Sequence, residues 1–254
     1  MTSIRRRACG ALLALLLAVP APWSPAGAAA QADRDMAVAR SLAEMLQAAR
    51  AVISNAQDLI NDPAIGDKRL TGEAVLKETV EIYSKATGIE PSKLDRNSRE
   101  GRLLHEMMAA IVEVVDDNQE AINAQGTGFK GFIPAVFARL VAEEFGRLAK
   151  GEAEVKVTAP PELVRNRKAR PDQWEADIIK TKLLDPAWPV GESYSATVAT
   201  NGRSAFRVMV PEYYVESCLA CHGSPKGQMD ITGYPKEGGK LNDLGAAISI
   251  TLFH

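Results

Sequence analysis

The sequence lacks an excess of charge of either sign and has little cysteine or histidine. Its 254 residues include 30 Lys or Arg against 32 Asp or Glu, a net charge of -2, with three cysteines and three histidines. A surface that neutralises nucleic-acid phosphates needs a clear excess of basic residues, so no nucleic-acid partner is expected. With 46% apolar residues the composition is that of a folded chain with a sizeable core rather than a disordered one.

A long apolar run occurs near the N-terminus. Arginines at positions 5–7 precede an apolar run over residues 11–19, and small residues follow at 26–30. This order is typical of a secretory signal peptide, here residues 1–30. The alternative, an uncleaved membrane anchor, is disfavoured because the run is shorter than the roughly 20 residues of a spanning helix. We therefore expect cleavage near residue 30 and a periplasmic mature protein.

Helical periodicity dominates residues 31–127. Between about residues 33 and 61, apolar residues alternate at spacings of four and three, which predicts a long amphipathic helix. The apolar seam consists of Leu42, Leu46, Ala49, Ile53, Ala56 and Ile60. We expect this seam to pack on its own domain, and a homodimer through this helix is the alternative. Further helices are predicted over residues 72–86, 98–124 and, after a glycine-rich break at 126–131, 134–148.

The pattern changes to that of strands after residue 151. Strands are predicted over residues 154–158, 193–198, 205–210 and 246–252, and Asn201-Gly202 predicts a hairpin turn. Asp172 and Glu175 predict a capping box at the start of a helix between the first two strands. Helices followed by a small antiparallel sheet indicate an α+β fold. We expect a helical region over 31–127 and a sheet region over 128–254, forming one structural unit.

Two of the three cysteines and one histidine fall within the pentapeptide Cys218-Leu219-Ala220-Cys221-His222. Cys-x-x-Cys-His is the attachment signature of c-type haem. The two thiols add across the two vinyl groups, and the adjacent imidazole becomes an axial iron ligand. Predicted export agrees with this interpretation, because haem is attached covalently outside the cytoplasm.

Other uses of the two cysteines were weighed. A cysteine-rich zinc site needs four ligands, and besides carboxylates only His105 and His254 remain. A disulfide stays an alternative, because exported thiols tend to oxidise. A thioredoxin-like pair is expected to open a helix after a parallel strand, whereas this pair is predicted to lie in a Gly- and Pro-rich connection.

Four segments of the sequence resemble one known family. It is the exported PAS-like c-type haem domain family, formerly a domain of unknown function, whose members occur alone or as the sensor part of histidine kinases and chemoreceptors. The resemblance implies a PAS-like antiparallel sheet with long N-terminal helices packed against it, and a haem c domain over residues 128–254. It implies one covalent haem c, with Cys218 and Cys221 as thioether anchors and His222 as proximal ligand. The segments are GFKGFIPAVFARLVAEEF (128–145), NRKARPDQWE (166–175), FRVMVPEYYVESCLACHG (206–223) and GYPKEGGKLNDLGAAISITL (233–252).

The second axial ligand is open. Some family members use a cysteine thiolate, but the one further cysteine here, Cys9, lies in the predicted signal peptide. Imidazole and thioether both bind haem iron, and His105 and then Met209 are the preferred candidates. Met45, Met107 and Met108 are further candidates, although methionines at core spacing more often serve packing. A vacant or water-filled position would permit gas binding.

The remaining predictions concern the rest of the pocket and the function. Arg165, Arg167 and Arg170 are expected to pair with the haem propionates, unless they form a solvated basic surface. Aromatic side chains expected to wall the pocket or to belong to the core are Tyr213, Tyr214 and Trp174.

We expect a sensor of redox state or of CO, NO or O2 that signals to a partner protein, with a periplasmic electron-transfer cytochrome as the alternative. No enzymatic activity is expected. A peroxidase-like reaction needs distal acid-base groups, for which so few histidines offer no pair.

Overall fold

Four antiparallel strands form one sheet in the computed structural model, which describes residues 25–254. The strands are β1 (Ala153–Thr158), β2 (Tyr194–Thr200), β3 (Arg203–Tyr213) and β4 (Leu244–Phe253), in the order β1-β4-β3-β2. The last strand therefore lies inside the sheet, with Ile250 opposite Val155 on one side and Val208 on the other. All four strands lie close to the predicted positions.

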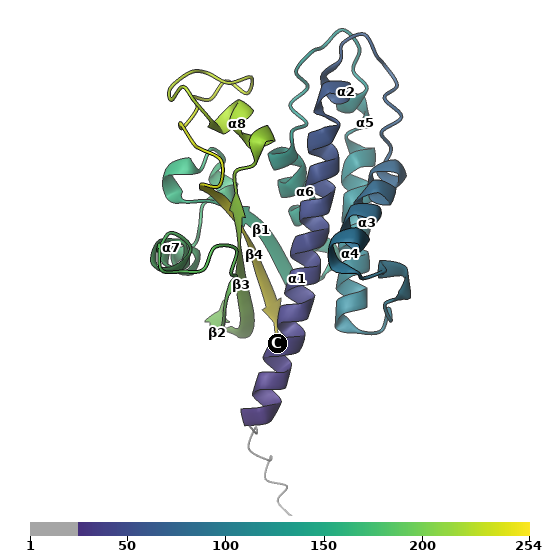
Figure 1. The fold of residues 1–254 in the computed structure, drawn as a ribbon. Coiled ribbons are helices and arrows are strands. Elements are labelled where there is room, and N and C mark those ends of the chain that lie inside the picture. The colour runs from purple at the N-terminus through teal and green to yellow at the C-terminus, as the bar shows by residue number, and fades with distance from the viewer. Residues whose placement is uncertain (1–24) are drawn as a thin grey trace, which may run out of the picture.

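The helices form two layers on one face of the sheet (Figure 1). α1 (Pro25–Asn55) and α6 (Pro134–Leu148) pack directly on the strands, and α3 (Gly72–Thr87) and α4 (Arg99–Asp117) lie on the far side of α1. The seam predicted for the first helix is buried inside the chain, as expected for packing on its own domain. Leu42, Leu46, Ala49, Ile53 and Ile60 are at most 1% exposed. One hydrophobic cluster joins residues of the helical region and the sheet region.

Two predicted helices are each divided in two. The first breaks at Ala56 before α2 (Gln57–Asn61), and the third breaks at Asn118 before α5 (Gln119–Ile122). At the second break, the Asn118 side chain donates to the carbonyl of Val114 at 2.7 Å. Such side chains compete with the backbone for helix carbonyls, which explains why the periodic pattern continues across the break while the helix does not.

The opposite face of the sheet carries α7 (Gln173–Ile178), which continues into the π-helical turn η4 (Ile179–Leu183). The predicted capping box is confirmed: Asp172 Oδ1 accepts from the Glu175 N–H at 2.8 Å, and Glu175 Oε2 accepts from the Asp172 N–H at 2.7 Å. A second hydrophobic cluster lies beneath this segment. Short 3-10 helices are η1 (Pro91–Lys93), η2 (Pro161–Leu163) and η3 (Arg167–Ala169).

The hairpin between β2 and β3 turns at the predicted residues. Asn201 and Gly202 have φ values of 52° and 76°. Two successive positive φ values are those of a type I′ turn, whose twist matches that of the flanking strands. This confirms the hairpin.

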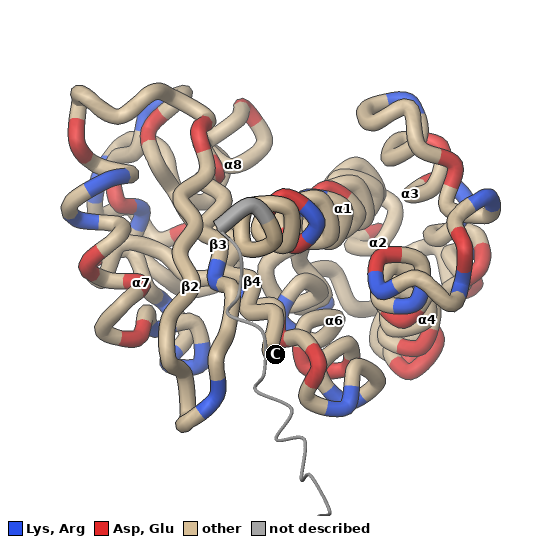
Figure 2. Tube along the Cα trace, turned by 90° about the horizontal axis from the view of Figure 1, so that it is seen from below, with Lys and Arg blue, Asp and Glu red and all other residues tan. Residues whose placement is uncertain are grey.

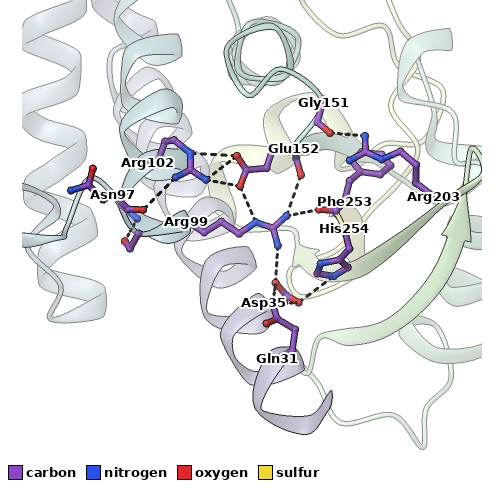
Figure 3. A network of polar contacts seen from close by, with 12 residues as sticks. Gln31, Asp35, Asn97, Arg99, Arg102, Gly151, Glu152, Arg203, Phe253 and His254 are labelled. Atoms are coloured by element: carbon purple, nitrogen blue, oxygen red, sulfur yellow. Dashed lines mark hydrogen bonds and ion pairs between the residues drawn. The ribbon is translucent and has the colours of Figure 1, made fainter. Parts of the chain in front are cut away.

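A polar network joins four distant parts of the chain at one end of the molecule (Figure 3). Arg99, at the start of α4, donates from Nη1 to Asp35 of α1 at 2.9 Å and from Nη2 to the carbonyl of Phe253 at 2.8 Å. Its Nε donates to Glu152, just before β1, at 3.1 Å. His254 approaches the same Asp35 carboxylate at 3.3 Å.

Charged residues of both signs are interspersed over the helices and loops (Figure 2). Among the helices of residues 25–254, none combines the length and the apolar character needed to cross a bilayer. Of the predicted signal peptide, residues 1–24 lie outside the described residues. Residues 25–30 form the first turns of α1, so the expected cleavage position falls within that helix.

Candidate functional site

The Cys-x-x-Cys-His motif lies on a short helix, α8 (Glu216–His222), directly after β3. The prediction that the motif lies in a Gly- and Pro-rich connection is therefore wrong. A thioredoxin-like cysteine pair would follow a parallel strand, whereas β3 is antiparallel to its neighbours. Helical spacing of three and four residues brings Cys218, Cys221 and His222 to one side of the helix. Seven residues are too few for a periodic signal, which is why the sequence did not reveal this helix.

Gly223 ends the helix because of a close contact. A Cβ atom at this position would lie 2.5 Å from the carbonyl oxygen of Leu219, closer than any side chain tolerates. The Gly223 N–H donates to the same carbonyl at 2.9 Å, and the Gly238 N–H donates to the carbonyl of Gly223 at 3.1 Å. The segment after the motif is thereby folded back against α8.

The thiols of Cys218 and Cys221 are half-buried and are not bonded to one another. Burial, assisted by the negative charge of Asp230, raises the pKa of Cys221. Both thiols lie between the fold interior and solvent, where an incoming group can reach them. No disulfide occupies the motif in this structure.

The imidazole of His222 is held from one side only. Its Nδ1 donates to Glu237 Oε2 at 3.0 Å, so the lone pair of Nε2 remains free for a metal ion. Burial, together with the nearby Arg165, lowers the pKa of His222 and favours the neutral form that can act as a ligand. The ring of Tyr214 stacks on it, with ring centroids 5.1 Å apart and an interplanar angle of 19°.

Arg165 joins the motif to the segment that follows it. Its Nη2 donates to the carbonyl of Cys221 at 3.0 Å, its Nε to Glu237 at 2.7 Å and its Nη1 to Asp230 at 2.6 Å. Burial alone would raise the pKa of Asp230, but hydrogen bonds from Thr232 and Arg165 hold it well below its usual value. This carboxylate therefore stays charged beside the guanidinium.

The three arginines predicted to meet propionates differ in position. Arg165 lies at the motif, but its donors are engaged by two carboxylates. Arg167 and Arg170 are exposed on and beside η3, and in the described part of the chain neither side chain bonds to a residue of the motif. The structure thus brings one of the three to the site.

Tyr214 is wedged between two glycines under the motif. A Cβ atom on Gly245 would lie 2.2 Å from its ring, and one on Gly239 would lie 2.6 Å from it. The hydroxyl of Tyr214 is buried without a hydrogen-bond partner, and burial, followed by the charge of Glu237, raises its pKa to about 12. Burying a hydroxyl without a hydrogen-bond partner costs free energy of folding, and the Tyr214 hydroxyl could donate to an additional group bound beside it.

Arg50 approaches the motif from α1. It forms an ion pair with Glu212 of β3, and its Nε is buried without a partner. Burial would lower the pKa of Arg50, but the Glu212 carboxylate raises it, with a smaller contribution from Cys218. The central helix of the fold therefore contacts the strand that leads into the motif. Neither Arg50 nor Glu212 has a sequence signal, because their proximity depends on how α1 packs on β3.

The two favoured candidates for the second axial ligand lie elsewhere. His105 is on α4, separated from α8 by α1 in both views (Figures 1 and 2), and its Nδ1 bonds to the carbonyl of Gly101 at 2.6 Å. Met209 is fully buried under α7 with Ile178, Leu183 and Ala247. Met45 and Met107 are fully buried in the main cluster, and Met108 packs against it. None of these side chains is brought to His222 in this structure.

The residues around the motif fit a haem. Two thiols and a free imidazole nitrogen share one side of α8, and two buried donors without partners, Arg50 Nε and Tyr214 Oη, flank it. Large apolar side chains are exposed along the same segment, at Val215, Met229, Ile231, Tyr234 and Leu241. A flat apolar ring with polar substituents could cover such a surface and satisfy such donors. Within residues 25–254, no group of three or more His, Cys, Asp or Glu is arranged around a metal position.

Comparison with known protein families gives a match over most of the chain. The family model described as Tll0287-like matches residues 29–252, which includes β1, β2, β3, all of β4 except Phe253, and the whole motif region. This extent agrees with the resemblance seen in the sequence, and it is consistent with a PAS-like domain. No curated protein and no solved structure matches the chain significantly. Because the matched region spans nearly the whole chain, the protein belongs to the Tll0287-like family.

Proposed function

We propose that this protein binds one haem c covalently outside the cytoplasm and acts there as a sensor module for redox state or a small gas. The observation that carries the proposal is the geometry of α8: both thiols lie on one side with His222, whose Nδ1 is held by Glu237 while Nε2 is free. Bound haem would supply an iron that changes oxidation state and takes small ligands.

Each residue of the site has a distinct role in this proposal. Cys218 and Cys221 would anchor the haem through their thiols, and His222 would supply a nitrogen ligand to its iron. Glu237 fixes the orientation of the imidazole and increases its basicity, as carboxylates behind ligating histidines do. Arg165 in turn holds Glu237 and the carbonyl of Cys221. Arg50 Nε and Tyr214 Oη are the donors best placed to meet polar atoms of the group.

The sensor role is supported by the contact between the motif region and α1. Glu212, four residues before α8, pairs with Arg50, and α1 packs against α3, α4 and α6. A change at the motif that displaces Glu212 would bias the packing of the central helix. Signalling to a partner protein would then proceed from the helical layers.

The test of covalent attachment uses the two cysteines and the two internal histidines. Exported wild-type protein should keep its haem absorption after denaturing extraction, and the Cys218→Ala/Cys221→Ala variant should lose it. His222→Ala should alter the spectra of the oxidised and reduced protein, whereas His105→Ala should leave them unchanged. Covalent haem in the double-cysteine variant would overturn the proposal, and a changed spectrum in His105→Ala would reinstate that histidine as a ligand.

An electron-transfer cytochrome is the second candidate, favoured by the exposed apolar side chains around the motif, such as Val215 and Leu241. Such side chains suit docking of a redox partner. CO separates gas sensing from electron transfer: a carrier with two strong ligands should not bind CO in the reduced state, whereas a gas sensor should bind it and change its helix packing. Redox sensing is instead tested by a difference in helix packing between the oxidised and the reduced protein. CO binding with no change in amide exchange of α1 would count against sensing.

A further inference from the structure

The two edges of the sheet differ in how they are covered. At one edge, β1 carries the charged side chains of Glu154 and Lys156, and its end is held by the segment that follows, where Thr158 Oγ1 donates to the carbonyl of Ala169 at 2.8 Å. Charged side chains and a covering segment keep an edge strand from pairing with another chain. The other edge strand, β2, is the strand farthest from the helical layers (Figures 1 and 2).

β2 has none of these protective features. No charged residue and no proline occurs from Ser193 to Gly202, in a chain of which 24% of the residues are charged. Thr197 and Ala199 are exposed, and the register with β3 runs through all seven residues of β2 without a bulge. An uncovered, regular and uncharged edge strand is a template for pairing with a further strand.

Alternate residues of β2 direct their backbone groups away from the sheet. Thr200 and Arg203 flank the type I′ turn and form the hydrogen-bonded pair that closes it, so every second residue back along β2 bonds to β3. The residues between, Ser195, Thr197 and Ala199, therefore present their N–H and C=O groups at the open edge. Outside the β2–β3 ladder, no backbone–backbone hydrogen bond of the described chain involves β2. A row of donors and acceptors is thus available there.

The strand is complementary to a second copy of itself. In an antiparallel pair, residues that face the edge lie opposite one another, and a pair centred on Thr197 matches all seven residues of β2. Thr197 then lies opposite Thr197 of the copy, which is a favourable cross-strand pair, and Ser195 lies opposite Ala199. Beyond the strand, the same register places Glu192 opposite Gly202, so no like charges meet.

We propose that two copies of this protein pair through β2 in an antiparallel arrangement, with a two-fold axis at Thr197 that joins their two sheets into one. A two-fold axis lets the same strand serve both copies, and such dimers are the commonest symmetric assembly. A seven-residue edge buries an area at the small end of the range for interfaces, below about 1,200 Å², so the dimer is weak and depends on concentration. The inference does not depend on haem, because β2 is no part of the motif region.

Sedimentation equilibrium of the purified full chain over a wide range of concentrations tests the dimer. The wild type should pass from monomer to dimer as its concentration rises. Thr197→Lys should raise the Kd of the dimer about fivefold, because it sets like charges opposite one another. An equimolar mixture of Thr197→Lys and Thr197→Glu should recover the association. Ala86→Lys, at an exposed position on α3, adds the same charge and should keep the wild-type Kd.

Thr197→Pro tests the backbone contacts. In the monomer the N–H of Thr197 faces solvent, and proline is tolerated at such positions of an edge strand. In the dimer the substitution removes two hydrogen bonds related by the two-fold axis, so the Kd should rise about tenfold or more. If Thr197→Pro does not fold, as judged by thermal unfolding, the mixture of the lysine and glutamate variants decides.

Two results would contradict the β2 dimer. One is a wild-type chain that stays monomeric up to about 1 mM, which would leave the edge to a strand of another protein. The other is a dimer whose Kd is the same in the wild type, Thr197→Lys and Thr197→Pro, which would place the interface on another surface.

Discussion

At the scale of single residues, His222, Glu237 and Arg165 form a continuous chain of contacts that sets the properties of the motif. Glu237 accepts from both His222 and Arg165, and burial alone would raise its pKa, but the hydrogen bond from Arg165 and the charge of its guanidinium lower it. Glu237 therefore stays ionised behind the imidazole. When the group that accepts the Nδ1 hydrogen bond is ionised, the Nε2 lone pair binds a metal ion more strongly than when that group is neutral.

Glu237→Gln should raise the midpoint potential of the haem-loaded protein by about 60 mV. The neutral amide still accepts a hydrogen bond from Nδ1, but it no longer increases the basicity of the imidazole, and a less basic imidazole stabilises oxidised iron less. Substitutions behind a ligating histidine change metal affinity about tenfold or more. A tenfold change corresponds to about 59 mV for one electron. Spectroelectrochemistry measures this shift. Glu216→Gln, an exposed position on the same helix, is the control. A potential unchanged in Glu237→Gln would show that the carboxylate does not act through His222.

Tyr214→Phe isolates the buried hydroxyl from the stacked ring. In protein without haem, the free energy of unfolding should stay the same or rise by up to about 1 kcal/mol, because a buried hydroxyl without a partner is removed while the ring remains. Tyr214→Ala should instead lose about 3 kcal/mol. Urea denaturation measures both. A large loss in Tyr214→Phe would mean that the hydroxyl has a partner in solution.

At the scale of elements, short segments acquire their conformation from one or two specific contacts. α8 ends where Gly223 meets the carbonyl of Leu219, and β4 passes Tyr214 at Gly245. α7 begins at a capping box whose two side chains also pair with Arg207 of β3. The two helices, α8 with seven residues and α7 with six, are too short to be stable by helix propensity alone.

Gly245→Ala should destabilise the protein by about 1–3 kcal/mol, because the added methyl would lie 2.2 Å from the Tyr214 ring. It should also disturb His222, which stacks on that ring. Gly146→Ala in α6 is the matched control: nothing lies within 4 Å of its Cβ position, so helix propensity should stabilise it by about 0.5–1 kcal/mol. Equal effects of the two substitutions in urea denaturation would contradict the contact.

Asp172→Asn should reduce stability at neutral pH by about 1 kcal/mol or less, since the side chain is half-exposed and solvent screens its charge. Burial alone would raise the pKa of Asp172, but the Glu175 N–H and Arg207 lower it below its usual 3.8. The stabilisation from the charge is therefore present above about pH 3.8 and is lost as the pH falls through the lower, folded-state pKa. Asparagine still caps α7. In urea denaturation from about pH 7 to about pH 3, the free energies of unfolding of the wild type and Asp172→Asn should approach one another as the pH falls. A difference that does not change with pH would mean that the substitution acts through the geometry of the cap and not through the charge.

At the scale of the whole molecule, α1 connects all parts. It packs on the sheet, on α6 and on the outer helices. Polar contacts attach it along its length, among them Asp35 to Arg99, Ser41 to Glu100 and, beside the motif, Arg50 to Glu212. The Asp35 side chain is 2% exposed, whereas its partners Arg99 and His254 are 22% and 29% exposed, so the carboxylate is the buried end of this network (Figure 3). The motif region and the C-terminal end of β4 are therefore both coupled to the same helix.

Arg99→Met should destabilise the protein by about 3 kcal/mol, because it removes the arginine from the buried Asp35, which keeps only Gln31 and His254, and frees the carbonyl of Phe253. Arg147→Met on α6 removes two ion pairs from a side chain that is 61% exposed, and it should change stability by less than about 1 kcal/mol. Comparison of their midpoints in urea tests this. Similar urea midpoints for the two variants would mean that the contacts of Arg99 contribute no more to stability than exposed ion pairs do.

The sequence by itself determined the features encoded by neighbouring residues. The capping box at Asp172 and Glu175, the hairpin at Asn201-Gly202, the four strands and the buried seam of α1 all follow from local spacing, and the structure agrees with each. The Cys-x-x-Cys-His motif is equally local, and so is its haem interpretation. Local patterns failed only where a side chain competes with the backbone, as at Asn118, or where a helix is as short as α8.

Only the tertiary structure decided which distant residues meet. It placed Glu237 behind His222 and Arg50 beside Glu212. It put α4, which carries His105, on the far side of α1 from α8 (Figure 1), and it gathered Arg207, Ser249 and Thr251 around one cavity. Such contacts join positions that are distant in the chain or lie on different elements, and periodicity specifies only which face of an element is buried. The partner that a buried face meets depends on how the elements pack, and this packing fixes the surroundings of the motif.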